Sequence, residues 1–124
     1  MPGDVVVVNF WYAQCPPCRV EAAHLESVWT DYQDEGVSFV GVNTIDQADQ
    51  ARSFAESWGV TYPSVIDAND GAVKLAFAAV SPISATPVTL VLDTRGRVAA
   101  RILGAIDSPS ILATLVRDTL EESA

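Results

Sequence analysis

Positively charged residues are scarce in this chain. It has 7 Lys and Arg against 16 Asp and Glu, which gives a formal net charge of −9 at pH 7. Nucleic acid and anionic membrane surfaces are therefore excluded as expected partners, because both are bound mainly through clustered Lys and Arg. The acidic residues are spread along the sequence, so they indicate a solvated surface rather than an acid-specific role.

Metal ligands and long apolar runs are also few. The sequence contains two cysteines, Cys15 and Cys18, and one histidine, His24. A structural zinc site needs four such ligands, so we expect no metal. No segment approaches the ~20 apolar residues of a membrane span, and Val5–Phe10 is too short and lacks the basic flank of a signal peptide. We expect either a cytoplasmic protein or a piece of a longer precursor, and the abrupt start at Met1 favours the piece.

What the sequence does contain is an alternation of strand and helix patterns. Apolar segments bounded by turn residues predict five strands: Val5–Phe10, Val37–Asn43, Ser64–Asp67, Val88–Asp93 and Val98–Leu103. Helical patterns lie between and after them: Arg19–Asp34, a helix capped by Asp46 and ending at Gly59, a short helix through Phe77, and a last helix from Ser108-Pro109. With 124 residues that are 49% apolar, this order predicts one three-layer α/β domain over residues 1–124. Its central mixed sheet would have about five strands flanked by helices.

The two cysteines lie at a junction between strand and helix, in Trp11-Tyr12-Ala13-Gln14-Cys15-Pro16-Pro17-Cys18. Two thiols at this spacing can close a small disulfide and open it again. At about 100° per residue, Cys18 shares the buried face of the helix with Ala22 and Leu25. Cys15 sits at the start of the helix and is expected to be partly exposed. We therefore expect Cys15 to attack a substrate and Cys18 to resolve the product.

The prolines between the cysteines affect the start of the helix. Free backbone N–H groups at a helix N-terminus favour a thiolate. Pro16 and Pro17 have no N–H, so if Cys15 caps the helix, the N–H of Cys18 becomes the main backbone donor to the Cys15 sulfur. Both prolines also stiffen the turn.

Two other features support redox chemistry. Thr86-Pro87 precedes a predicted strand, and a cis proline there would bring its loop against the end of Val5–Phe10, in the crevice that holds Cys15. Glu21 lies one turn past Cys18. An ordinary carboxylate at the helix boundary is one interpretation; the other is a buried group with a raised pKa, suited to exchanging a proton with Cys18.

At this point the chain resembles the thioredoxin superfamily, and within it the extracytoplasmic thiol-disulfide oxidoreductases of the TlpA, ResA and CcmG (DsbE) branch. The resemblance rests on Val8-Asn9-Phe10-Trp11, Cys15-Pro16-Pro17-Cys18-Arg19, Glu21, Tyr62-Pro63, Thr86-Pro87, Leu90-Val91-Leu92-Asp93 and Gly96. It implies a thioredoxin-like fold. We expect this chain to depart from the branch in one respect, the absence of the branch's usual N-terminal hairpin. We expect no cofactor.

The resemblance also implies roles for individual residues. Cys15 would be the nucleophile, Cys18 the resolving thiol, and Glu21 the carboxylate that handles the proton. Pro87 would be the cis-proline that docks substrate. The substrate-binding set that we expect is Trp11, Pro16, Pro17, Thr86 and Pro87, although Trp11 is also suited to packing around the motif.

The leading functional hypothesis is a thiol-disulfide oxidoreductase that acts on protein thiols and disulfides. The branch implies cytochrome c maturation or other extracytoplasmic disulfide chemistry, with apocytochrome c or secreted proteins as substrates and a membrane thiol reductant as redox partner. We expect a monomer. Two alternatives stay open: a thioredoxin-like binding module with a structural disulfide, and a thiol peroxidase.

Overall fold

A computed structural model of the protein, which describes residues 3–78 and 86–123, contains one five-stranded mixed sheet. The elements follow one another as β1 (Val5–Trp11), α1 (Pro16–Tyr32), β2 (Val37–Asn43), α2 (Ala48–Trp58), β3 (Ser64–Ile66), α3 (Ala72–Phe77), β4 (Val88–Leu92), β5 (Val98–Leu103) and α4 (Pro109–Ser123). The predicted order of strands and helices is confirmed, and so is the three-layer α/β fold.

The sheet order is β3-β2-β1-β4-β5, which places β1 at the centre. Strand β1 runs parallel to β2 and antiparallel to β4. The register pairs Phe10 with Val88. Pro87, the residue before β4, is therefore brought to the carboxyl end of β1, where the chain turns into the cysteine loop.

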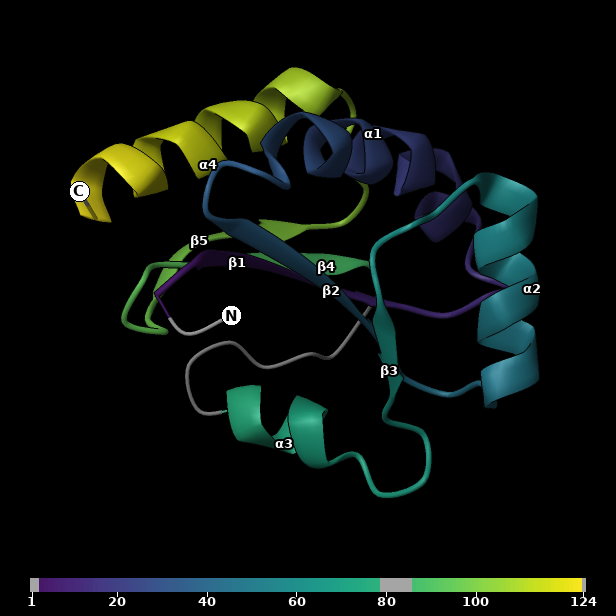
Figure 1. The fold of residues 1–124 in the computed structure, drawn as a ribbon. Helices are drawn as coiled ribbons and strands as arrows, with labels where there is room; N and C mark the ends of the chain where they lie inside the picture. The colour runs from purple at the N-terminus through teal and green to yellow at the C-terminus, as the bar shows by residue number, and fades with distance from the viewer. Residues whose placement is uncertain (1–2, 79–85, 124) are drawn as a thin grey trace.

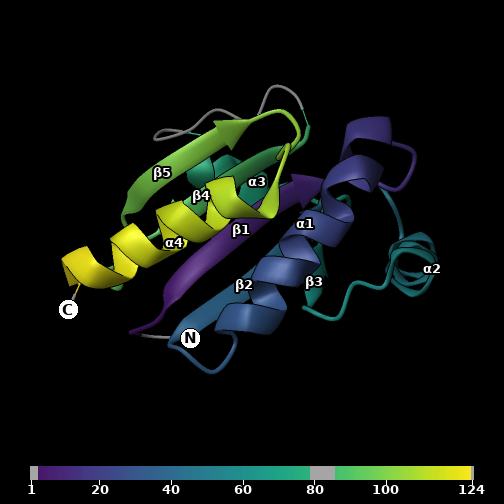
Figure 2. The same cartoon turned by 90° about the horizontal axis from the view of Figure 1, so that it is seen from above.

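Helices cover both faces of the sheet. Helices α1 and α4 lie side by side on one face, and α3 lies on the other, while α2 stands beyond β3 at one side of the molecule (Figure 1, Figure 2). The run of valines in β1 supplies both faces: Val5 and Val7 belong to the core under α1 and α4, and Val8 belongs to the core on the α3 side. A strand buried on both faces explains the continuous apolar sequence.

Two helix starts differ from the prediction. Helix α1 begins at Pro16 rather than Arg19, because Cys15 caps it and prolines fit its first two positions. Helix α2 begins at Ala48 and is capped by Gln47, so the prediction of Asp46 as the cap is wrong. The carboxylate of Asp46 is instead turned inward and accepts a hydrogen bond from the backbone N–H of Ala13 at 2.7 Å.

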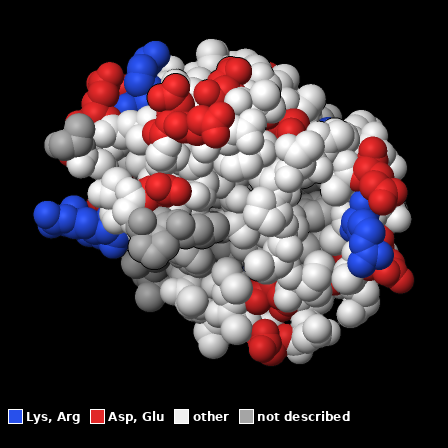
Figure 3. Space-filling view, viewed as in Figure 1, with Lys and Arg blue, Asp and Glu red and all other residues white. Residues whose placement is uncertain are grey.

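Few of the charged side chains at the surface form ion pairs. In the described part of the chain there are two ion pairs, Arg52 with Asp49 at 3.2 Å and Arg97 with Asp93 at 3.1 Å. On the face in Figure 3, acidic groups lie in separate places around a broad neutral area. Within residues 3–78 and 86–123, no helix has the length and apolar character that crossing a membrane requires.

Candidate active site

The two cysteines form a disulfide at the first turn of α1, with their Cα atoms 5.2 Å apart. Cys15 is the N-cap, with an extended backbone at φ −77° and ψ 109°. Its sulfur accepts a hydrogen bond from the backbone N–H of Cys18 at 3.2 Å. This is the donor that the sequence predicts when Pro16 and Pro17 have no N–H to offer.

The predicted difference in exposure between the two sulfurs is wrong for this disulfide form. Cys15 is 1% exposed and Cys18 is 2% exposed. The reason is packing: both cysteines lie in one apolar cluster with Trp11 and with Phe54 of α2, and the cap turns the Cys15 sulfur back onto the helix. The two sulfurs are distinguished by position instead. Cys15 caps the helix, whereas Cys18 lines a partly open pocket between α1 and α2.

Glu21 is completely buried, and it lies one turn after Cys18 on the same face of α1. The side-chain amide of Asn9, in β1, donates to Glu21 Oε1 at 2.8 Å. The backbone N–H of Ile106, in the loop before α4, donates to Oε2 at 3.1 Å. Both carboxylate oxygens therefore have a partner, which the sequence could not indicate because these partners are 12 and 85 positions away.

Burial raises the pKa of Glu21 from 4.5 to about 7, although the hydrogen bonds from Asn9 and Ile106 oppose the rise. A carboxyl group with this pKa can accept or release a proton near neutral pH. The ionised Glu21 carboxylate only accepts hydrogen bonds, whereas the protonated carboxyl group also donates one and so needs an acceptor nearby. Asn9 can supply either, because its amide carries both, and its Nδ2 also bonds Thr89 Oγ1 at 3.0 Å. The hydroxyl of Thr89 can in turn donate or accept.

Three of the expected substrate-binding residues, Trp11, Pro16 and Pro17, lie in or against the cysteine motif, and the roles of all five stay predictions. The Thr86–Pro87 peptide bond is cis, the form that the resemblance implies. Pro87 is buried, whereas Pro16 and Pro17 are exposed beside the disulfide. Trp11 is 5% exposed and its ring lies 4.5 Å from that of Phe54. It therefore covers the interior of the motif rather than its outer face.

Two polar residues, Arg19 and Asp46, hold the cysteine loop in place, a role that sequence reasoning missed. Arg19 Nε donates to the carbonyl of Ala13 at 3.0 Å. Asp46 accepts from the Ala13 N–H, and also from the Asn43 amide at 2.9 Å. The loop before Cys15 is thus fixed from α1 on one side and from the end of β2 on the other.

The site thus combines a cysteine pair at the start of α1 with a cis peptide bond before Pro87. The sequence profile described as the AhpC/TSA family matches residues 1–101. The chain belongs to the AhpC/TSA family. Its match to thioredoxin-like thiol-disulfide proteins confirms the predicted superfamily.

Relatives of this AhpC/TSA chain include the thiol-disulfide oxidoreductase ResA of Geobacillus thermodenitrificans, which is 33% identical over 109 residues. The match covers 88% of this chain and 60% of ResA, so the chain spans about three fifths of that protein's length. Among solved structures, a thiol:disulfide interchange protein of the thioredoxin family from Chlorobium tepidum TLS has a TM-score of 0.87 at 26% identity, covering 96% of this chain and 81% of that one. A secreted thiol-disulfide isomerase from Corynebacterium glutamicum has a TM-score of 0.85 at 28% identity, with 96% and 72% covered.

Proposed function

We propose that this protein is a thiol-disulfide oxidoreductase that exchanges its Cys15–Cys18 disulfide with the cysteines of protein substrates. The observation that carries the proposal is the disulfide at the N-cap of α1, with a buried carboxylate one turn deeper. A helix start stabilises the thiolate that must attack or leave in such an exchange. Glu21 supplies a proton site one turn along α1 from the sulfur that must lose its proton.

In the reducing direction the thiolate of Cys15 attacks a substrate disulfide. A bond forms between Cys15 and one substrate sulfur, and the other substrate sulfur leaves as a thiolate. Cys18 then attacks the Cys15 sulfur, which closes the internal disulfide and releases the second substrate sulfur. Two electrons pass to the substrate, and each released sulfur takes up a proton. The reverse sequence oxidises a substrate dithiol.

Glu21 acts in the second half of this cycle. Cys18 attacks only as a thiolate, so its proton must leave before the mixed disulfide can resolve. With a pKa raised to about 7, ionised Glu21 can take this proton and later return it. Asn9 and the Ile106 N–H hold the carboxylate in position while it does so.

We base the proposed cellular location and partners of this protein on its similar proteins. The Corynebacterium glutamicum protein is described as secreted, which supports an extracytoplasmic location for this chain. We propose protein substrates of the cytochrome c maturation or secretory type, with a membrane thiol reductant as electron source. A cytoplasmic location is the alternative.

Trapping tests the proposed function. The variant Cys18→Ser lets Cys15 attack but prevents resolution, so substrates stay linked to Cys15 and can be identified by mass spectrometry after non-reducing separation. The matched control Cys15→Ser should capture none. Equal capture by the two variants would contradict the assignment.

A redox titration separates this function from a structural disulfide. Equilibration with dithiothreitol mixtures should yield one two-electron transition, and the reduced protein should then reduce insulin disulfides. A disulfide that reduced partners leave intact would favour the binding module. Peroxide consumption without a disulfide substrate would favour the peroxidase.

A further inference from the structure

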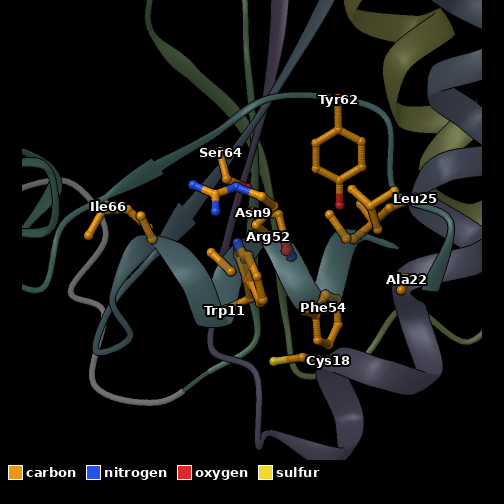
Figure 4. Close-up of a pocket in the computed structure, with 14 residues that line it drawn as sticks. Asn9, Trp11, Cys18, Ala22, Leu25, Arg52, Phe54, Tyr62, Ser64 and Ile66 are labelled. Atoms are coloured by element: carbon orange, nitrogen blue, oxygen red, sulfur yellow. The ribbon is translucent and has the colours of Figure 1, made fainter. Parts of the chain in front are cut away.

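Next to Cys18 lies a cavity of about 260 Å³, partly open to solvent, between α1, α2 and the β2–β3 edge of the sheet. Its walls are largely apolar, and the side chains that define it best are Cys18, Leu25, Phe54 and Ile66 (Figure 4). An apolar cavity of about 150 Å³ is enough to hold benzene. The space here is therefore sufficient for a two-ring molecule.

Two buried donors face this cavity without a partner. Tyr62 is 7% exposed and Trp11 is 5% exposed. Among the described residues, neither the Tyr62 hydroxyl nor the Trp11 indole N–H has a hydrogen-bond acceptor, whereas the indole N–H of Trp29 donates to Thr61 at 3.1 Å. Figure 4 shows the Tyr62 hydroxyl and the Trp11 nitrogen directed towards the middle of the cavity. Buried donors are normally paired, so this arrangement calls for an acceptor.

Gly41 in β2 lets two side chains of the cavity wall pack closely against the strand. An ideal Cβ on Gly41 would collide with Ser64 Oγ and would lie 2.9 Å from Trp11 Nε1. Glycine thus lets the indole nitrogen of Trp11 and the hydroxyl of Ser64 approach the strand from the cavity side.

The charge around the cavity favours a neutral occupant. Burial and the nearby Glu21 and Glu26 raise the pKa of Tyr62, so its hydroxyl keeps its proton and donates. The same carboxylates disfavour an anion. Arg52 is the one charged residue among the described residues of the lining, and it is already paired with Asp49 at 3.2 Å.

We propose that this cavity binds a small, planar, neutral molecule with an apolar body of about two rings and a carbonyl oxygen, which accepts from the Tyr62 hydroxyl. The occupant would lie against Cys18. The cavity shares Cys18 with the proposed exchange site, but binding to the oxidised protein requires no exchange of disulfides.

Binding of three probes to the oxidised protein tests the proposal. We would follow amide shifts of labelled protein by NMR while adding 2-acetonaphthone, naphthalene, or 2-naphthoate. The ketone should bind tightest, because naphthalene lacks the acceptor and naphthoate carries the disfavoured charge. Shifts should be saturable and centred on the cavity residues.

Variants locate the site. Tyr62→Phe removes one hydrogen bond, worth about 0.5–1.5 kcal/mol, and should weaken ketone binding by about 3–10-fold while leaving naphthalene binding unchanged. The matched control Tyr32→Phe, at the end of α1 and outside the cavity, should change neither. Ala51→Phe fills the cavity from α2 and should abolish binding of both probes.

Three results would overturn the proposal: no saturable binding of the ketone, binding of the ketone to Tyr62→Phe as tight as to the unaltered protein, or tighter binding of naphthoate than of the ketone. The measurement uses the disulfide form alone. Its failure would leave the proposed oxidoreductase activity untouched, and loss of insulin reduction would leave the cavity proposal untouched.

Discussion

At the scale of single residues, Glu21 is the most unusual group in the molecule. A carboxyl group that is fully buried among apolar side chains is costly when ionised, and only two donors compensate it. Natural cores seldom contain such a group unless it is paired. Under the proposed exchange its place one turn after Cys18 offers a reason for that cost, because a resolving thiol needs a proton acceptor that titrates near neutral pH.

Stability should therefore depend on pH through Glu21. Below pH 4.5 both folded and unfolded chains carry the proton, whereas between pH 4.5 and about 7 only the folded chain does. Raising the pH across this range thus favours the unfolded chain, by about 3 kcal/mol in total. Urea unfolding of oxidised protein and of Glu21→Gln at pH 4 and pH 8 measures this. Glu21→Gln should lack the loss of unfolding free energy between pH 4 and pH 8. The same pH dependence in the variant and in the unaltered protein would contradict the prediction.

The same variant should affect catalysis. Glu21→Gln cannot accept the proton of Cys18, so release of the mixed disulfide should slow by about 10²-fold or more, the typical contribution of a positioned base. Stopped-flow resolution of a preformed mixed disulfide measures the step. The rate of the first attack by Cys15, which precedes that proton transfer, serves as the internal control and should change little.

At the scale of elements, the start of α1 determines how well the Cys15 thiolate is stabilised. The only donor to its sulfur among the described residues is the Cys18 N–H. Pro17→Ala returns an N–H at the second helical position, where caps usually receive a donor. One added hydrogen bond of about 1 kcal/mol should raise the rate of alkylation of reduced Cys15 near neutral pH, by up to about fivefold.

The adjacent proline provides the control. Pro16→Ala restores an N–H at the first helical position, which does not face the cap, so the alkylation rate should stay within about twofold of the original. Equal acceleration in both variants would point to loosening of the turn rather than to hydrogen bonding.

Strand β2 offers a second test at this scale. Gly41 has no unusual backbone angle, so its requirement is steric: Ser64 and Trp11 occupy the space of a Cβ. Gly41→Ala should cost about 1–3 kcal/mol of unfolding free energy through overpacking. The double variant Gly41→Ala with Ser64→Gly removes the closest clash and should recover part of the loss in urea titrations. No recovery would mean that the Trp11 side chain or the backbone carries the strain.

At the scale of the whole molecule, the dominant property is excess negative charge with little pairing. A net charge of −9 and only two ion pairs in the described residues leave net repulsion at neutral pH. Raising NaCl from 10 mM to 300 mM should relieve about 0.5–1 kcal/mol, which corresponds to a Tm increase of about 2–6 °C. Near pH 4, where many carboxylates are protonated, the same salt step should have a smaller effect on Tm.

Most of the fold could be predicted because its signals are local. Each signal affects only the residues next to it. Examples are the valine run of β1, the glycine after Trp58, and the prolines at positions 16 and 17. The cap of α1 and its donor were predictable for the same reason. The burial of Cys15 was not, because it depends on Phe54 in another helix. The partners of Glu21 and Asp46 were not either, since no local pattern in the sequence brings Ile106 or Ala13 to a carboxylate.

The hydrogen bonds of Glu21 have a consequence for how this sequence can change. They join β1, α1, β4 and the loop before α4 through Asn9, Thr89 and the Ile106 N–H. Each buried side chain in this set satisfies another, so an exchange at one position alters what is acceptable at the rest. Asn9, Glu21 and Thr89 should therefore be inherited as a unit. A replacement of one of them will be tolerated only where the other two have also been replaced.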